Sequence, residues 1–195
     1  EAERALVAAG RQESFLYQNL LNDRALAYYQ TARYGESAAL FGRVAAAWSK
    51  TLGPNHPHTL TALADEAGAL SEEGRFAEAV PRLRELLARQ RAISAAPASF
   101  ASTLNTLGIA LLDLDRPAEA LAPLRESLEL NVATYGEEHF ATIFSHQLVA
   151  RAHLALGDPV AAGPELAAAR RAAATVYAAD DTTVPQTSNA NLSVG

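Results

Sequence analysis

The amino-acid sequence predicts an all-α protein built from about four copies of a helix-turn-helix unit. One segment of about forty residues returns four times with its apolar, small and turn residues in the same order. The turn inside each copy falls at Tyr34, Phe76, Pro117 and Pro159, which are spaced by 41 or 42 residues. A period of this length is typical of elongated repeat arrays whose units share one continuous core.

Glycine and proline mark where the predicted helices end and begin. Residues 1–9 are expected to form the end of a helix that Gly10 terminates, since glycine adopts the left-handed conformation common after helices. Gly74, Gly157 and Pro117 supply turns between paired helices. The first helices of the four pairs are predicted at 12–32, 59–73, 99–114 and 141–156, and the second helices at 36–51, 76–93, 117–134 and 159–179.

These helices divide the chain into three predicted parts. Residues 1–10 are the end of a preceding helix and 11–180 form one array. Residues 181–195 are rich in Thr, Ser, Asn, Gln and Ala and show no periodicity, which predicts a flexible C-terminal tail. The repeats of the array are expected at about 12–52, 59–93, 99–135 and 141–179.

The best-defined copy reads apolar-x2-Leu-Gly-x2-apolar, followed by Ala-x3-apolar. Its residues are Leu104, Leu107, Gly108, Leu111, Ala120 and Leu124. This pattern resembles the tetratricopeptide repeat (TPR). The resemblance implies a right-handed superhelix, or α-solenoid, with a partial N-terminal helix in addition to the four pairs.

Two loops narrow the resemblance to one variety of repeat. Residues 51–59 and 134–142 share a Thr and a Gly-x-x-His sequence and lie two periods apart. With the long period, these loops make the chain similar to kinesin-light-chain repeats. The loop at 94–99 lacks the Gly-x-x-His sequence, so its local geometry is expected to differ.

Composition and charge restrict the functions that the chain can have. Hydrophobic residues make up 49% and charged residues 19%, which suits a folded protein. The 16 basic and 22 acidic residues give a formal net charge of −6, and the basic residues are dispersed, which argues against nucleic acid and anionic membranes as partners. No apolar stretch reaches membrane-spanning length. Cysteine is absent, so disulfides and thiolate metal sites are excluded.

The chain begins with Glu1 and contains no Met, so we expect the native start to be absent. Targeting signals are therefore not predictable from this sequence. A cytoplasmic location is the expectation for such a chain.

The TPR resemblance implies that the first helices line a concave groove in which an extended peptide or a partner helix lies. Asn22, Asn105 and Gln147 form a ladder of amides on this face, and amides both donate to and accept from a peptide backbone. The alternative is that polar residues of these helices simply face water. The predicted groove residues are Asn19, Asn22, Asp23, Leu26, Tyr29, Thr61, Asp65, Ser102, Asn105, Ile109, Gln147 and Arg151.

The charged residues of the predicted groove indicate what kind of ligand it favours. Asp23, Asp65 and Asp113 make it mildly acidic, which favours a basic ligand, although solvated surface acids are the commoner explanation. Arg151 is the single basic residue expected there, which argues against a clamp for a C-terminal carboxylate.

The sequence offers no catalytic or metal-binding pattern. His56 and His139 occupy equivalent loop positions, so a hydrogen bond that fixes the loop explains them better than zinc, which needs three or four converging ligands. His146 and His153 are expected to pack between helices. No Gly-x-Ser-x-Gly sequence or phosphate-binding glycine loop is present, so neither an enzyme nor a cofactor is predicted.

The sequence thus predicts a non-catalytic protein–protein interaction module, part of a larger regulatory or signalling protein, that binds a peptide or protein segment. Two alternatives remain open. One is a structural scaffold that forms a homo-oligomer, with the groove empty or filled by the chain's own tail. The other is a repeat domain that senses a small molecule and controls an attached effector.

Overall fold

The computed structural model describes residues 2–11 and 14–181 of the chain. The predicted tail lies almost entirely outside the described residues. Within the described part, helix α1 (Ala2–Ala8) precedes four helix pairs. The first helices of the pairs are α2 (Phe15–Gln30), α4 (Pro57–Glu72), α6 (Pro97–Asp113) and α8 (Phe140–Ala155). The second helices are α3 (Tyr34–Thr51), α5 (Phe76–Ala92), α7 (Pro117–Tyr135) and α9 (Pro159–Asp181).

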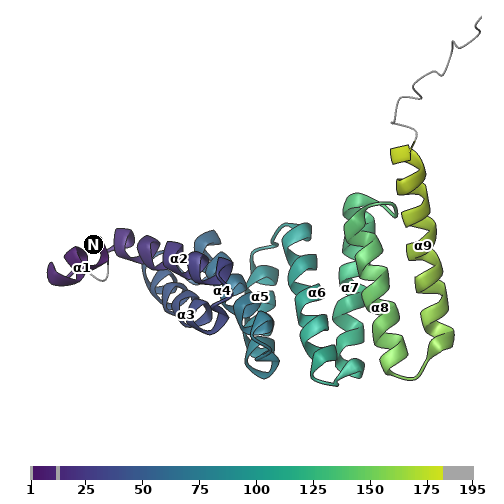
Figure 1. Cartoon of the computed structure of the whole chain (residues 1–195), viewed down its shortest axis with the longest axis horizontal. Helices are drawn as coiled ribbons and strands as arrows, with labels where there is room; N and C mark the ends of the chain where they lie inside the picture. Colours follow the sequence, from purple (N-terminus) through teal and green to yellow (C-terminus); the bar gives the residue numbers. More distant parts are fainter. Residues whose placement is uncertain (1, 12–13, 182–195) are drawn as a thin grey trace, which may run out of the picture.

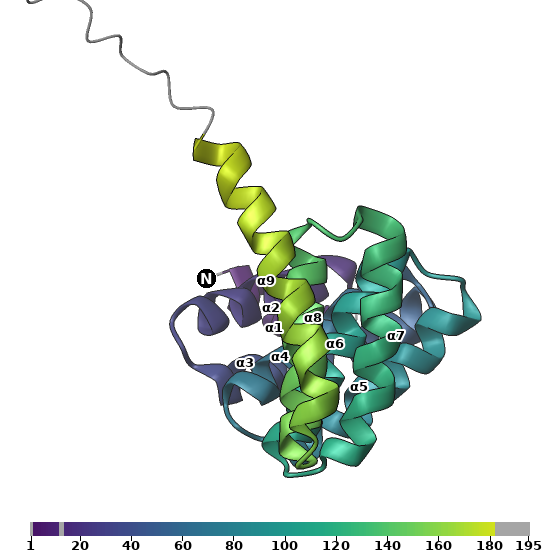
Figure 2. The ribbon, with the colours of Figure 1, turned by 90° about the vertical axis from the view of Figure 1, so that its right-hand side faces the viewer.

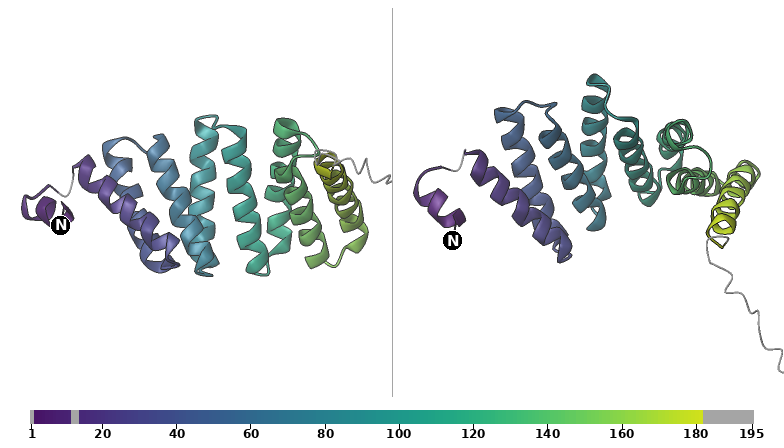
Figure 3. Two further views of the ribbon diagram at one scale, coloured as in Figure 1. Left: turned by 45° about the horizontal axis from the view of Figure 1, so that its top comes forward. Right: turned by 90° about the horizontal axis from the view of Figure 1, so that it is seen from above.

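The helices lie side by side along the long axis of the molecule, from α1 at one end to α9 at the other (Figure 1). Two further views show the same succession (Figure 3), and the view along the long axis has α9 in front (Figure 2). Each helix packs against the next one in the chain, and α4, α6 and α8 also contact one another in succession. In a curved array, the row of helices on the inside is more closely spaced than the row on the outside. Because the first helices α4, α6 and α8 contact one another in succession, the first helices form the inner side of the array.

The turn between paired helices has one conformation that different residues adopt. Gly74 and Gly157 have φ angles of 78° and 74°, where glycine lacks the steric penalty of a side chain. Ala32 and Asp115, at the equivalent positions, adopt φ angles of 56° despite their side chains. The repeat therefore maintains the turn even where the sequence does not favour it.

An ion pair recurs at the start of the second helices. In three pairs, an Arg just before the helix forms an ion pair with a Glu three residues later. This Glu lies in the first turn, where the helix dipole stabilises a negative charge. These pairs are Arg33–Glu36, Arg75–Glu78 and Arg116–Glu119. In the fourth pair, the Asp158 carboxylate instead accepts a hydrogen bond of 2.9 Å from the backbone N–H of Ala161.

Small residues allow paired helices to approach closely. Ala79, Ala120 and Ala162, the alanines of the repeat pattern, are 0%, 0% and 1% exposed. Gly108 of α6 packs directly against the fully buried Leu124 of α7. The apolar core therefore runs continuously between the two rows of helices, as the repeat pattern predicts.

The two similar loops are held by matching hydrogen bonds. His56 Nδ1 accepts from the N–H of His58, and His139 Nδ1 accepts from the N–H of Ala141, each at 3.2 Å. This confirms the predicted loop-fixing role of both histidines. The threonine of each loop donates to the carbonyl of the glycine six residues earlier, at 2.9 Å and 2.7 Å.

The loop between α5 and α6 is different, as its sequence predicts. Helix α6 begins at Pro97, and Ala96 before it provides no side-chain cap. Ser94 adopts a φ angle of 50°, and the Gln90 amide donates to Ser99 Oγ at 3.1 Å across the loop. A side-chain bond between neighbouring helices thus replaces the histidine cap. Within the described residues, no helix is both long and apolar enough to cross a membrane.

Candidate functional site

The predicted groove residues lie on the first helices of the four pairs, which form the inner side of the array. We use the name inner face for the surface that these predicted residues span: Asn19, Asn22, Asp23, Leu26, Tyr29, Thr61, Asp65, Ser102, Asn105, Ile109, Gln147 and Arg151. Most of these side chains are exposed or half-buried, so a ligand can reach them. Asn105 is the exception, because only 9% of it is exposed.

A hollow of about 290 Å³ opens on the inner face between α6 and α8, and the C-terminal end of α7 closes one side of it. Three predicted residues, Ser102, Asn105 and Ile109, line this α6–α8 hollow. The full lining is Ala98, Ser102, Asn105, Thr106, Ile109, Asn131, Tyr135, Phe140, Ala141 and Phe144. The structure therefore brings three predicted groove residues together in one cavity, but Asn105 is the only member of the predicted amide ladder among them.

The polar part of the hollow is a small network of side chains. Ser145 Oγ accepts hydrogen bonds from the amides of Asn105, at 3.3 Å, and Asn131, at 2.9 Å. Asn105 Oδ1 is buried and has no hydrogen-bond partner among the described residues. Because a buried acceptor without a donor costs free energy, this oxygen has an unmet capacity for a ligand N–H.

The apolar part of the hollow consists of exposed aromatic rings. Tyr135, Phe140 and Phe144 are 42%, 76% and 44% exposed. His139 lies between the first two: its ring stacks on Tyr135 with centroids 4.3 Å apart and contacts Phe140 at 4.5 Å. The histidine that caps α8 thus also orients two rings of the rim.

The inner face is acidic at α2 and α4. Burial raises the pKa of Asp65, whose carboxylate has no hydrogen bond or ion pair with any described residue. The pKa of Tyr29 is also raised, chiefly by burial and then by the negative charge of Glu72. Asp23 adds an exposed carboxylate on α2. Tyr29 is thus neutral, and the carboxylates of Asp23, Asp65 and Glu72 form the negative surface that favours cations.

The basic residue predicted on this face is already paired. Arg151 of α8 forms an ion pair with Asp113 at the end of α6. This corrects the expectation that Asp113 contributes to a free acidic groove, since its charge is balanced by Arg151. The negative charge of the inner face therefore comes from α2 and α4.

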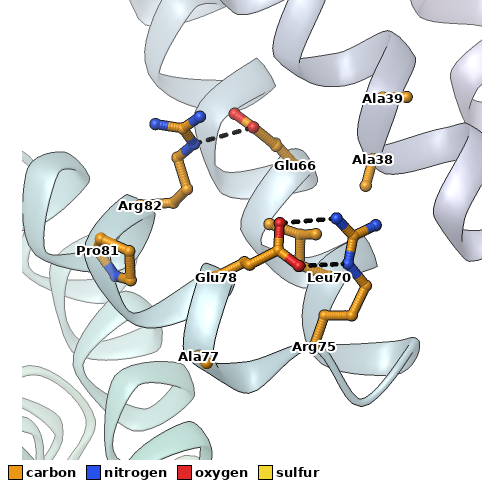
Figure 4. A pocket seen from close by; sticks show the side chains of 9 residues that line it. All are labelled: Ala38, Ala39, Glu66, Leu70, Arg75, Ala77, Glu78, Pro81 and Arg82. Carbon is orange, nitrogen blue, oxygen red and sulfur yellow. Dashed lines mark hydrogen bonds and ion pairs between the residues drawn. The ribbon is translucent and has the colours of Figure 1, made fainter.

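A second hollow, of about 350 Å³, lies away from the inner face between α3, α4 and α5 (Figure 4). Its charged side chains bond one another: Arg82 Nε donates to Glu66 at 2.9 Å, and Arg75 contacts Glu78 at 2.7 Å. Burial raises the pKa of Glu66, and the Arg82 charge partly opposes that rise. Because these groups satisfy one another, this hollow is less suited to a polar ligand.

His146 and His153 are buried, as predicted. His146 is 8% exposed, and its ring nitrogens lie 2.6 Å from Glu165 and 3.2 Å from Glu137. His153 is 6% exposed and lies 3.1 Å from an Arg125 nitrogen. In the described part of the chain, no three histidine, aspartate or glutamate side chains are arranged to hold a metal ion.

Most of the lining of the α6–α8 hollow was not among the predicted groove residues, and three of the missed residues lie where α7 ends and α8 begins. Asn131 and Tyr135 belong to a second helix, α7, and Phe140 to the start of α8. The TPR resemblance places the groove on the first helices, so the prediction did not include the end of α7. The signal that could have found them is the Gly-x-x-His loop, which holds the end of α7 against the start of α8.

Comparisons with known proteins agree with this architecture. A family model described as tetratricopeptide repeat matches residues 16–92 and 99–174, well over half of the chain. A crystal structure of nearly identical TPR-like repeats from a putative kinesin light chain of Podosopora anserina is 25% identical. It covers 89% of this chain and 83% of that chain, with a TM-score of 0.76. A second crystal structure of those repeats, also 25% identical, covers 90% and 84% with a TM-score of 0.78.

The crystal structure of BtubC (BKLC) from P. vanneervenii shares the fold at lower identity. It is 16% identical to this chain, covers 92% of this chain and 71% of that chain, and has a TM-score of 0.75. No curated protein sequence matches the chain. The family match and these structures confirm the predicted right-handed α-solenoid and its similarity to kinesin-light-chain repeats.

Proposed function

Because the chain belongs to the tetratricopeptide repeat family, we propose that it is a non-catalytic module that binds an extended segment of a partner protein along its inner face. Repeats of this family are a general protein–protein interaction module. The neighbours of known structure include repeats of a putative kinesin light chain, which supports a role as the interaction part of a larger regulatory or signalling protein.

The observation that carries this proposal is the combination of accessible apolar side chains and amides on one face. Leu26 and Tyr29 of α2 and Phe144 of α8 are 41%, 36% and 44% exposed, so large apolar side chains are accessible to a ligand on the first and the last of the first helices. Gln147 is exposed and Asn22 half-buried, so their amides can pair with the backbone of an extended segment.

Charge supports a basic segment as the ligand. Asp23 and Asp65 of the inner face and the adjacent Glu72 have no ion-pair partner among the described residues, whereas Arg151 is paired with Asp113. A ligand with Lys or Arg would balance the charge of α2 and α4. Its affinity should fall as salt is added, because exposed ion pairs are screened.

The test is selection of a displayed library of random dodecapeptides on the immobilised chain, followed by fluorescence anisotropy with the selected peptides. The double variant Asn22→Ala/Gln147→Ala should bind them more weakly by about 2 kcal/mol, about 1 kcal/mol for each lost hydrogen bond. Asn55→Ala, which removes an exposed amide from the loop before α4, is the matched control and should bind normally. A library without enriched peptides, or equal binding by all three proteins, would contradict the proposal.

Self-association is a second candidate, supported by apolar residues near the turn between α8 and α9. Leu154, Leu156 and Val160 are 51%, 43% and 84% exposed there. If this surface joins two copies, the mass measured by light scattering should rise with concentration and return to that of a monomer in Val160→Asp. A constant monomer mass would exclude this candidate.

A further inference from the structure

We infer that the α6–α8 hollow is the specificity pocket of the inner face and that it takes one large apolar side chain of a basic peptide. The inference rests on the proposed function and adds to it the place and the chemistry of the selected residue. The peptide backbone beside that residue donates an N–H to Asn105 Oδ1. Lys or Arg residues elsewhere in the same peptide lie towards Asp65 and Asp23.

The size and lining of the hollow match a side chain. Pockets for small molecules are commonly about 300–1,000 Å³. At about 290 Å³, this hollow is just below that range and suits a single phenylalanine, tyrosine, tryptophan or leucine side chain. Ile109, Phe144 and Tyr135 provide apolar walls of the kind that such a side chain contacts.

The buried amide gives the second, independent indication of a ligand. Asn105 is more than nine-tenths buried and lines the hollow, its Nδ2 is used by Ser145, and its Oδ1 has no donor among the described residues. An extended peptide carries one backbone N–H per residue, and these point alternately to its two edges, so it supplies the missing donor without an extra polar side chain. The Asn105 side-chain amide therefore favours a peptide whose backbone N–H lies next to the apolar anchor.

The charges of the inner face decide between peptide classes. An acidic peptide would meet the carboxylates of Asp23 and Asp65 and the nearby Glu72, with no unpaired cation of the described inner face to offset them. A basic peptide meets the same carboxylates favourably. The occupant is thus a peptide that combines one large apolar residue with flanking Lys or Arg.

The experiment uses the complete chain and the peptides selected from the random dodecapeptide library. The selected peptides should share one large apolar residue and an excess of Lys and Arg. Replacing that apolar residue with Ala should weaken binding by about tenfold or more, as expected for an anchor in a pocket. A shared sequence without an apolar residue, or with an excess of acidic residues, overturns the inference.

Two variants of the hollow locate the anchor. Ser102→Trp places a large ring at an exposed position of the lining, and Phe144→Ala removes one wall. Both should lose the preference for the apolar residue. Phe15→Ala is the matched control, because it removes a phenyl ring of similar exposure, 46% against 44%, from α2 outside the hollow. Circular dichroism melting curves establish that each variant is folded.

The outcomes separate this inference from the proposed function. If Asn22→Ala/Gln147→Ala loses binding while Ser102→Trp and Phe144→Ala bind as tightly as the unmodified chain, the pocket is wrong and the groove stands. If no peptide is enriched on the unmodified chain, both proposals fail. Loss of the anchor preference in the two hollow variants, with normal binding by Phe15→Ala, supports the pocket.

Discussion

Gly108 provides a direct test of how closely α6 and α7 pack. A Cβ atom at this position would lie 2.2 Å from Cδ2 and 2.4 Å from Cγ of Leu124. Carbon atoms in contact are normally about 3.5–4.0 Å apart, so the substitution Gly108→Ala creates an overlap of more than about 1 Å. Leu124 is 0% exposed and has no solvent into which it can turn. The two helices must therefore separate or the core must rearrange.

The expected free-energy change combines two opposing effects. Overpacking a core costs about 1–3 kcal/mol, and the large overlap at Leu124 favours the upper end. Alanine is a better helix former than glycine by about 0.8–1 kcal/mol, which offsets part of this cost. We expect Gly108→Ala to lower the free energy of unfolding by about 1–2 kcal/mol.

Gly68→Ala is the matched control for this measurement. Gly68 lies in the interior of α4, and a Cβ atom there would meet nothing within 4 Å. Only the helix-propensity effect remains, so this variant should be more stable than the unmodified chain by about 0.5–1 kcal/mol. The same chemical change thus has opposite signs at the two positions.

Urea denaturation followed by far-ultraviolet circular dichroism measures both changes. Slopes must be compared as well as midpoints, because repeat arrays are stabilised by interactions between neighbouring units and can unfold in parts. If Gly108→Ala is as stable as the unmodified chain, or if both glycine variants change stability in the same direction, the close packing of α6 on α7 is wrong.

Three further predictions concern packing, protonation and the amides. Ala120→Leu fills a 0% exposed position and should lower stability by about 1–3 kcal/mol, so an unchanged melting temperature would refute the repeat register. Burial holds the pKa of Glu66 above its usual value, so the folded chain binds the proton more tightly than the unfolded chain. Ionisation of Glu66 therefore costs stability as pH rises from about 4.3. Glu66→Gln can still accept a hydrogen bond from Arg82 but does not ionise. In urea titrations, its free energy of unfolding relative to that of the unmodified chain should therefore increase as pH rises from about 4.3. A difference that does not change with pH would contradict this. Asn22→Ala/Asn105→Ala should stay helical and bind selected peptides more weakly by about 1 kcal/mol per lost hydrogen bond, measured by anisotropy. It should also lose about 0.5–1.5 kcal/mol of stability, because Asn105 bonds Ser145.

The repeat pattern predicts the fold because each of its features has a local physical cause. Ala120 and Gly108 are small where two helices cross, and His56 and His139 cap the helices that follow them. Such requirements act within one unit or between neighbours, so they recur with the period. The recurring Arg-x-x-Glu pairs, such as Arg75–Glu78, are of the same kind, because each acts within one turn of a single helix.

The candidate site was less predictable, because it depends on contacts between successive pairs. Asn105 occupies a first-helix position that the repeat assigns to the groove. Its burial follows from Ser145 of the next pair, which lies close enough to bond the amide at 3.3 Å. Arg151 of the fourth helix pair likewise forms an ion pair with Asp113 of the third. The helical period specifies the face of one helix, but not how far the next pair covers that face.

The difference between the two matching junctions explains why the hollow lies near α7. A displacement of 83 residues relates the loop 134–142 to the loop 51–59, and the same displacement relates Asn131 to Trp48. Trp48 is 4% exposed, and its ring lies 5.4 Å from His58 and 6.3 Å from Phe15. Asn131 presents a much smaller amide at the equivalent position and lines the α6–α8 hollow. In a repeat array the shared residues maintain the fold, so a site that selects one ligand must come from residues at which the copies differ. The exchange of an indole for an amide is such a difference, since it leaves space between two pairs and places a hydrogen-bonding group at its edge.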